Sequence, residues 1–515
     1  MSGCSMVELS LLYMDMRTLL MKYWEMTVVF VVAMVVVGFI LFSSPGMAGN
    51  DGYYHISIAS IIWEQGLTFE FPYLEFTLLD SEHYVDMHML FHLLQSPFTA
   101  WLDLESAAKL SSAVFIALTF VLFVWLLKQY EIRYPLFWAF ILLILSESFL
   151  YRMMMPRPPI FALAYTWLAF HFLMQKRFVA LAVVACLFAW TYKVFPILLP
   201  MAVISMVVYY VCERKVTIKP LFAVLAGIAA GMIITPYFPD NVEFLYNAIQ
   251  AKILSDGYVA GVGNEWYPLK TLDLLKDAYI PLGLYLAGIL ITNREEWKSD
   301  PARLFWFLLA SMWLLMLFKS RRFIEFFPPA ALLFFLFSIR PHLGHFSVAG
   351  SLKSMRGRVA ALVLVSAVLL SGVAMLSGTN EWLQRRMPVE AYQGGSQWLV
   401  ENTPAGATVF HTDWDDFPRM FFHNRHNRYI VGLDPDYMRL KDADMYSVWR
   451  KISRGKIKHP EDIILNEFGT EYVLTDTRHK RFIKAADNNM RMKRMFFDKY
   501  TIVYRVLSPS DLSPL

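Results

Sequence analysis

Hydrophobic residues are concentrated in long apolar runs, separated by charged segments, as far as about residue 376. A helix needs about 17 to 25 apolar residues to cross a bilayer, and the runs approach or reach that length. The eleven runs are Thr27–Phe42, Ala107–Leu127, Leu136–Leu150, Ile160–Met174, Phe178–Tyr192, Phe195–Val211, Pro220–Pro236, Ala278–Thr292, Leu304–Phe318, Phe323–Ile339 and Val359–Leu376. This pattern predicts an α-helical polytopic membrane protein with about eleven transmembrane helices.

Lysine and arginine gather in every second connection if each run crosses the membrane once. The positive-inside rule assigns those connections to the cytoplasm. They contain Arg17 and Lys22; Lys128 and Arg133; Lys176 and Arg177; Arg214, Lys215 and Lys219; Arg294, Lys298 and Arg303; and Lys353, Arg356 and Arg358. We therefore expect a cytoplasmic N-terminus, a membrane module over residues 1–377 with outer loops at 44–106, 151–159 and 237–277, and an extracytoplasmic domain over 378–515.

The first outer loop opens with the polar segment Gly49-Asn50-Asp51-Gly52, just past the first run. Asp51 is either a helix-capping residue or a metal-holding or base carboxylate at the mouth of an active site. Apolar spacing after it predicts an amphipathic helix from Asp51 to about Gln65 that lies along the membrane surface. A second helix is expected from Asp86, on which His88 and His92 lie one turn apart. That pair is either a metal chelate or a surface coincidence.

The loop at 237–277 contains Gly261-Val262-Gly263-Asn264-Glu265-Trp266, whose glycines favour a mobile backbone. Glu265 is thus either the acid of a loop that folds over a ligand or an incidental charge. Cations also gather on the outer side, against the positive-inside trend; they are Arg152, Arg157, Lys193, Lys319, Arg321 and Arg322. A bound anion such as a lipid phosphate explains them, and snorkelling to headgroups is the alternative.

From about residue 380 the hydrophobic runs shorten and their spacing changes. Alternation predicts a small α/β domain with four strands, at Ala407–His411, Arg428–Leu433, Glu471–Thr475 and Thr501–Leu507. Helices are expected at Phe417–Phe422 and Pro460–Glu467. The segment His411-Thr412-Asp413-Trp414-Asp415-Asp416-Phe417-Pro418 follows a strand directly, where α/β folds place ligand contacts, although an acidic capping loop is an equal reading.

Composition supports a membrane protein, because 57% of the 515 residues are hydrophobic and 17% are charged. The formal net charge is +4, and no basic stripe with interleaved aromatic residues occurs, so no nucleic-acid partner is expected. Cys4, Cys186 and Cys212 are the only cysteines, and all precede the C-terminal domain. We therefore expect neither a disulfide framework nor a cysteine metal site.

Four short motifs follow one another along the chain: Asn50-Asp51-Gly52-Tyr53-Tyr54, Gly263-Asn264-Glu265-Trp266, Arg322-Phe323 and Trp414-Asp415-Asp416-Phe417. Their order and sidedness over nearly the whole chain resemble those of oligosaccharyltransferase catalytic subunits. Those enzymes belong to the GT-C class of membrane glycosyltransferases, which use polyprenyl-phosphate-linked sugars. The resemblance implies a polyprenyl-linked sugar donor, a bacterial or archaeal cytoplasmic membrane, and a protein, lipid or glycan acceptor.

The resemblance also implies roles for individual residues. Asp51 corresponds to the catalytic or metal-binding carboxylate, and Glu265 to the mobile-loop glutamate that meets the acceptor. Arg322 corresponds to the contact with the donor phosphate, a site that Arg321, Arg152 and Arg157 would widen. Trp414, Asp415, Asp416 and Tyr54 are the implied acceptor contacts. Hard oxygen ligands favour Mg²⁺ or Mn²⁺ on Asp51, with Glu147 and His88 as further candidate ligands.

Two departures from the family pattern leave the acceptor open. The second Asp-x-Asp of the oligosaccharyltransferases is replaced by the segment from Glu147 to Pro159, in which only Glu147 offers a carboxylate. Its Arg157-Pro158 pair is more similar to the single-sugar GT-C transferases that act on proteins or lipid A. Asp416 and Phe417 also stand where the acceptor motif Trp-Trp-Asp-Tyr-Gly has Tyr and Gly.

The expected reaction is displacement at an anomeric carbon with a lipid phosphate or diphosphate leaving. That leaving group needs charge neutralisation, which a cation on Asp51 and the Arg322 guanidinium would provide, or Asp51 acts as the general base. A lipid-linked sugar flippase is an alternative, but it should carry ionisable residues near the bilayer midplane, and the runs are almost free of them. A non-catalytic scaffold would leave the outward carboxylates unexplained.

Overall fold

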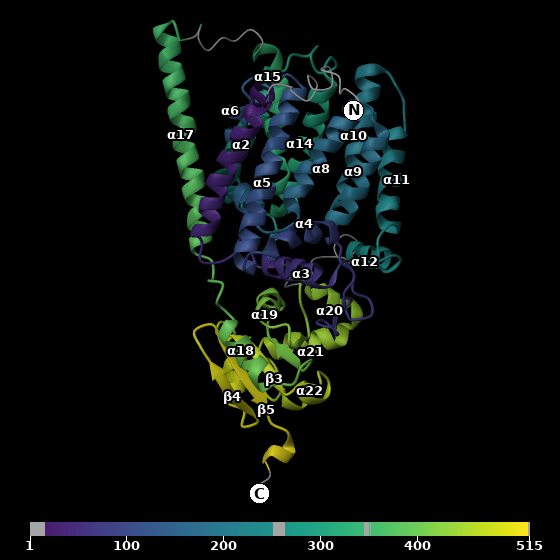
Figure 1. The fold of residues 1–515 in the computed structure, drawn as a ribbon, viewed down its shortest axis with the longest axis vertical. Coiled ribbons are helices and arrows are strands. Elements are labelled where there is room, and N and C mark those ends of the chain that lie inside the picture. Colours follow the sequence, from purple (N-terminus) through teal and green to yellow (C-terminus); the bar gives the residue numbers. More distant parts are fainter. Residues whose placement is uncertain (1–15, 251–262, 344–349, 351, 513–515) are drawn as a thin grey trace, which may run out of the picture.

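The computed structural model of this protein describes residues 16–250, 263–343, 350 and 352–512. A helical bundle forms one end of the molecule, and a small α/β region, residues 393–512, forms the other (Figure 1). The predicted fold class, a polytopic helical protein with a C-terminal α/β region, is confirmed.

Six helices of the described chain are long and apolar enough to cross a membrane. They are α2 (Met16–Ser43), α5 (Leu104–Gln129), α10 (Leu198–Glu213, with the 3-10 turn η1, Phe195–Ile197, before it), α13 (Thr271–Ile291), α14 (Pro301–Lys319) and α17 (Met355–Gln384). Shorter apolar helices complete the bundle: α8 (Pro159–Met174), α9 (Phe178–Thr191), α11 (Lys219–Ile233) and α15 (Phe327–Leu343). The number of spans, eleven, remains a prediction.

The apolar run Leu136–Leu150 is not the single span that we expected. It divides into α6 (Pro135–Leu143) and α7 (Glu147–Met154), which meet at 89°. Ser146 explains the break, because its hydroxyl accepts from the Phe149 amide and caps α7. The Asp277 carboxylate accepts from both the Ser146 hydroxyl and the Ser148 amide. Polar partners at the bend thus start a new helix within an apolar run.

Three shorter helices, α3 (Asp51–Gln65), α4 (Met89–Thr99) and α12 (Asp240–Ile249), lie across the end of the bundle that faces the α/β region (Figure 1). Helix α3 begins at Asp51, as predicted. It does not present one apolar face to the membrane surface, however, because every residue from Gly52 to Ile62 is buried. Helices α4 and α5 contact it on the bundle side and α19 (Phe417–His423) on the other. The second predicted helix begins at Met89, three residues later than expected.

The α/β region contains a five-stranded mixed sheet of order β2-β1-β3-β5-β4. Its strands are β1 (Thr408–His411), β2 (Arg428–Tyr429), β3 (Tyr472–Asp476), β4 (Met492–Phe497) and β5 (Thr501–Val506). All four predicted strands are present. Strand β4 was missed because it is an edge strand with mostly exposed side chains, so it lacks the apolar alternation that marks a half-buried strand.

Helices pack around this sheet. They are α18 (Gln393–Asn402), α19, α20 (Pro435–Lys441), α21 (Ala443–Ser453), α22 (Glu461–Asn466) and α23 (Lys480–Asp487). Further 3-10 turns among the described residues are η3 (Asn264–Trp266), η4 (Arg321–Glu325), η5 (Trp414–Asp416) and η6 (Pro509–Leu512). Strands β2, β1 and β3 are parallel neighbours, so the loops that follow them emerge at the same edge of the sheet. The loop after β1 carries the acidic segment Asp413-Trp414-Asp415-Asp416, and the loop after β3 carries Arg478 and His479.

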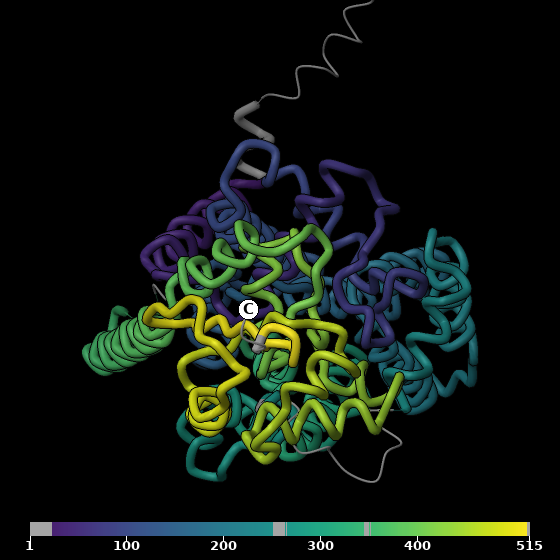
Figure 2. The backbone as a smooth tube through the Cα atoms, turned by 90° about the horizontal axis from the view of Figure 1, so that it is seen from below, coloured from purple at the N-terminus to yellow at the C-terminus, as the bar shows by residue number. Residues whose placement is uncertain are grey.

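Polar contacts join the α/β region to the bundle. The Asn50 side chain donates to the Asp415 carboxylate (3.0 Å) and accepts from Arg419 Nε (3.0 Å). Arg419 also lies 4.2 Å above the Tyr53 ring and donates to the Pro388 carbonyl. Figure 2, seen along the bundle, shows the α/β region covering its end while α17 stands apart at the side. The junction is therefore built on the residues that flank Asp51.

Candidate active site

A cavity of about 900 Å³ lies at this junction. The bundle contributes Asp51 and Arg157, the short turn η3 contributes Glu265 and Trp266, and the α/β region contributes the acidic segment after β1. The full lining is Asn50, Asp51, Arg157, Gly263, Glu265, Trp266, Arg385, Arg386, Met387, Pro388, Tyr392, Asp413, Trp414, Asp415, Asp416, Arg419, Leu433, Asp434, Pro435, Arg478, Lys499 and Tyr500. Residues from the whole length of the chain thus converge on one cavity.

Asp51 is held by an ion pair with Arg157, whose Nη1 lies 3.2 Å from Asp51 Oδ2. A close backbone approach makes this pair possible. The Cβ of any other residue at Gly52 would lie 2.3 Å from the Pro156 ring, so only glycine lets α3 approach the segment that carries Arg157. The Asp51 side chain remains 35% exposed, toward the cavity.

Glu265 accepts from two arginines and lies near a third. Its carboxylate is 3.0 Å from Arg322 Nη1, 3.1 Å from Arg152 Nη2 and 3.9 Å from Arg157 Nη1. Burial alone would raise the pKa of Glu265, but the guanidinium groups of Arg322, Arg157 and Arg152 outweigh it and hold that pKa well below its usual range. The glutamate is therefore ionised at any physiological pH and acts as a counter-charge to three arginines.

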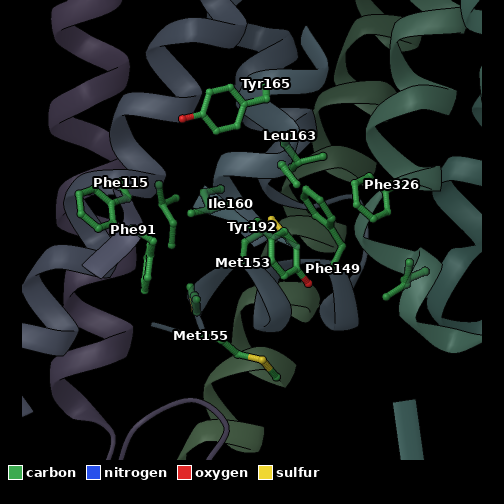
Figure 3. Close-up of a cluster of buried hydrophobic side chains, with 14 of the residues drawn as sticks. Phe91, Phe115, Phe149, Met153, Met155, Ile160, Leu163, Tyr165, Tyr192 and Phe326 are labelled. Carbon is green, nitrogen blue, oxygen red and sulfur yellow. The ribbon is translucent and has the colours of Figure 1, made fainter. Parts of the chain in front are cut away.

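Arg322 and Arg152 are each oriented by a further partner. Arg322 Nη2 donates to the Tyr192 hydroxyl (2.5 Å), and its guanidinium lies 5.1 Å from the centre of the Trp266 ring. Arg152 also pairs with the buried Glu325. Tyr192 belongs to a buried apolar cluster with Phe149 and Met153 of α7 and Ile160 and Leu163 of α8 (Figure 3). This packed core holds Tyr192, and through it Arg322, from the bundle side.

The acidic segment after β1 forms the opposite wall. Asp413 caps the turn, since its carboxylate accepts from the Asp415 amide. Burial, together with the nearby charges of Asp51 and Asp413, raises the pKa of Asp415 to about 6. Burial, together with the charges of Asp413 and Asp476, raises the pKa of Asp416 well above its usual range. Carboxylates thus gather on the α/β wall of the cavity, where Arg419 and Arg478 also lie, and Arg157 lines the bundle wall.

No protein-family model and no curated protein matches this sequence. Solved structures do share the fold. The structure of archaeal oligosaccharyltransferase AglB from Archaeoglobus fulgidus in complex with an inhibitory peptide and a dolichol-phosphate aligns over 96% of this chain and 75% of AglB, with 13% identity and a TM-score of 0.65. ArnT from Cupriavidus metallidurans, bound to undecaprenyl phosphate, aligns over 95% of this chain and 99% of ArnT, with 14% identity and a TM-score of 0.58. The chain has the GT-C fold.

Within this GT-C fold, six of the site residues expected from the sequence line the one cavity. They are Asp51, Glu265, Arg157, Trp414, Asp415 and Asp416. Arg322 and Arg152 join them through their bonds to Glu265. Arg321 does not, because its guanidinium donates to the Tyr267 and Pro268 carbonyls.

Three other expected residues lie elsewhere in the GT-C fold. Glu147 packs against Gly378 of α17 and does not line the Asp51 cavity. Tyr54 is buried, with its hydroxyl 2.9 Å from that of Tyr84. Tyr54 and His88 line a separate small cavity of about 80 Å³, which Asp51 also lines. An acceptor or a substrate phosphate in the large cavity would not contact these side chains directly.

The expected metal ligands do not form a divalent-cation site. Within residues 16–250, 263–343 and 352–512, no group of three or more His, Cys, Asp or Glu side chains is arranged so that it could hold a metal ion. Asp51 is already paired with Arg157, and Glu147 lies outside its cavity. An AglB structure that aligns over 93% of this chain, with 12% identity and a TM-score of 0.59, is a complex with Zn and sulfate. The donor set around Asp51, with a guanidinium in contact, does not fit such an ion.

A buried hydrogen-bonded chain behind Asp51 was not anticipated. The Asp86 carboxylate is 2.7 Å from His92 Nδ1, and His92 Nε2 is 2.7 Å from His55 Nδ1. Burial first, and then the charges of His92 and His88, lower the pKa of His55 well below its usual value. One sequence signal existed, because His55 follows Asp51 by four residues and so lies on the same face of α3.

Proposed function

We propose that this protein transfers a sugar from a polyprenyl-phosphate or -diphosphate carrier to an acceptor on the outer face of a bacterial or archaeal cytoplasmic membrane. One observation carries the proposal: Arg152, Arg157 and Arg322 converge on Glu265, which lines the same cavity as Asp51 between an apolar bundle and an α/β region. The GT-C fold supports it, since AglB and ArnT structures of that fold hold a dolichol-phosphate and undecaprenyl phosphate.

The three arginines suit the leaving group. Guanidinium groups bind phosphate oxygens through paired, charge-assisted hydrogen bonds. In the present structure the Glu265 carboxylate takes the position of an anion among them. A donor phosphate would replace Glu265 at these nitrogens, and the displaced glutamate would turn toward the cavity. The arginines would then stabilise the charge that develops when the bond between the anomeric carbon and the phosphate oxygen breaks.

Asp51 is proposed as the general base. It faces the cavity, and its carboxylate is paired with Arg157 beside the proposed phosphate site. The acceptor nucleophile would lose its proton to the Asp51 carboxylate while it forms the new bond to the anomeric carbon, and the polyprenyl phosphate would leave as an anion. In this proposal the Arg157 guanidinium, not a metal ion, is the positive charge beside Asp51.

The acceptor is proposed to enter from the α/β side. Trp414, Asp415 and Asp416 line that wall, and Asp415 is tied to the bundle by its hydrogen bond from Asn50. Acceptor contacts would therefore sit directly opposite the arginines. The anomeric carbon would lie between the two walls, within reach of Asp51.

Purified full-length protein, supplied with radiolabelled sugars on polyprenyl phosphate, tests this function. Release of polyprenyl phosphate, together with transfer or hydrolysis of the sugar, is expected from the wild type and should be lost in Asp51→Asn. Glu64→Gln is the matched control, since Glu64 is an exposed acid on the same helix. Translocation of the intact lipid across vesicles without bond cleavage would identify a flippase, and neither outcome would identify a scaffold.

A further inference from the structure

A second cavity, of about 560 Å³, lies at the same edge of the sheet. It shares Asp413, Trp414, Pro435 and Arg478 with the proposed active-site cavity. This arrangement follows from the topology, because β1 and β3 are parallel neighbours and their following loops carry Trp414 and Arg478, respectively. The two cavities therefore share a wall.

The second cavity is strongly basic. Arg450 and Arg454 line it from the end of α21, and Lys480 and Arg481 from the start of α23. In the part of the chain that the structure describes, none of these four cations lies within 4.0 Å of an acidic side chain. Only one carboxylate, that of Asp413, is among the lining residues. Unpaired guanidinium groups around a concave surface are the arrangement that binds phosphate.

The interior of this cavity supplies an independent sign of a ligand. Ser453 lines it, is only 7% exposed, and its hydroxyl has no hydrogen-bond partner among the described residues. A buried hydroxyl without a partner costs free energy that a bound ligand oxygen would recover. Beside it, the Trp449 indole is fixed by donating to the His411 carbonyl (2.8 Å), and Tyr446 packs nearby. Aromatic walls with polar groups between them suit a sugar ring.

We propose that this basic cavity binds a phosphorylated saccharide, and that this saccharide is the acceptor. Its phosphates would contact Arg454 and Arg481, a sugar hydroxyl would bond to Ser453, and its chain would pass Trp414 into the active-site cavity. The acceptor part rests on the proposed transferase function; the binding part does not. The inference assigns an acceptor class, an anionic saccharide, that the motif around Asp415 left open.

Titration of full-length protein in detergent with glucose 1,6-bisphosphate tests the binding part without any donor. The double variant Arg454→Gln, Arg481→Gln is expected to weaken binding at least about tenfold, because two charge-assisted contacts are lost. The variant Lys456→Gln, Lys458→Gln removes the same charge from exposed positions that do not line the cavity, and it should change affinity less than about twofold. Ser453→Ala, which keeps the charge, should weaken binding about threefold.

Any of three titration results would overturn the inference: no binding by the wild type, equal weakening in both double variants, or inorganic phosphate binding as tightly as the bisphosphate, which would mean that the sugar is not recognised. Hydrogen exchange of the wild type tests the site without any variant, so its result does not depend on whether a variant folds. The bisphosphate should slow exchange in residues 446–455 and 478–486, and unchanged exchange there would also overturn it.

Two further measurements separate the parts of the inference. Competition by a phosphorylated glycolipid in nanodiscs would support a membrane-borne acceptor, whereas unchanged affinity would support a soluble one. If binding holds but no donor is ever cleaved, the transferase function fails while the binding site stands. If donor cleavage holds but phosphorylated and unphosphorylated saccharides are glycosylated equally, the acceptor class fails alone.

Discussion

The Asp51 carboxylate lies 3.2 Å from the Arg157 guanidinium. Asp51 begins a helix that crosses the end of the bundle, and Arg157 follows the second half of a bent helix. Through Arg157, which is also 3.9 Å from Glu265, the proposed base is connected to the arginine cluster. The proposed base and the proposed phosphate site thus share one cation.

Replacing Arg157 should therefore affect both the proposed base, Asp51, and the proposed phosphate site. Arg157→Gln is expected to lower the rate of polyprenyl-phosphate release about 100-fold, because one preorganised donor to the developing charge is lost. Arg157→Lys should restore part of the rate, since it keeps the charge without the fork of donors. Arg494→Gln, on the exposed edge strand, should leave the rate unchanged. A full rate in Arg157→Gln would remove this arginine from the mechanism.

Gly52 is expected to tolerate no side chain. In Gly52→Ala the methyl group would push α3 away from Pro156, which should cost about 1 to 3 kcal/mol and separate Asp51 from Arg157. The thermal unfolding midpoint and the turnover rate should both fall. Gly38→Ala is the control, because nothing lies within 4 Å of a Cβ at Gly38. Equal behaviour of the two variants would contradict the close approach.

Glu265→Gln tests whether the glutamate holds the place of a phosphate. The neutral side chain leaves Arg152 and Arg322 short of a counter-charge, so polyprenyl phosphate should bind about tenfold more tightly. The apo protein should at the same time be less stable, since buried cations lose a partner. Titration by intrinsic fluorescence measures the first effect and thermal unfolding the second. Weaker phosphate binding would show that Glu265 contacts the donor instead of competing with it.

Asp415 should make stability depend on pH. Burial and the charges of Asp51 and Asp413 raise its pKa to about 6 in the folded protein, from 3.8. The folded state therefore binds this proton more tightly than the unfolded state, so the stabilisation is complete below about pH 4 and is lost as the pH rises through about 6. Asp415→Asn should match the wild type at pH 4 and unfold about 2 to 4 °C higher at pH 7.

Asp444→Asn, an exposed acid on α21, is the control for that comparison. It should shift the unfolding midpoint by the same small amount at both pH values. A difference between Asp415→Asn and wild type that does not change with pH would mean that the carboxyl is ionised throughout the range.

Chelation should have little effect on the proposed reaction. The guanidinium contact on Asp51 and the lack of a three-ligand group in the described chain do not fit a resident divalent cation. Treatment with EDTA followed by desalting is therefore expected to change the rate of donor cleavage less than about twofold. Loss of activity that Mg²⁺ or Mn²⁺ restores would refute this and would return Asp51 to the role of a metal ligand.

Much of the fold could be predicted from local patterns. Apolar runs located the bundle helices, and alternation located four of the five strands. The break between α6 and α7 could not be predicted in this way. Ser146 interrupts the apolar run because its hydroxyl donates a hydrogen bond to Asp277, which lies far along the chain. The burial of α3 was missed for a similar reason, since the α/β region that covers it comes from the end of the chain.

The sequence by itself determined which residues carry charge next to the apolar runs, and therefore that Asp51, Glu265 and the arginines lie where the bundle ends. Hydropathy is a local property, so it suffices for that. Only the tertiary structure decided the pairing: Arg157 with Asp51, three arginines with Glu265, and Arg321 and Glu147 elsewhere. Which charges meet depends on helix bends and on close packing between segments far apart in the chain. Neither can be predicted from the local sequence.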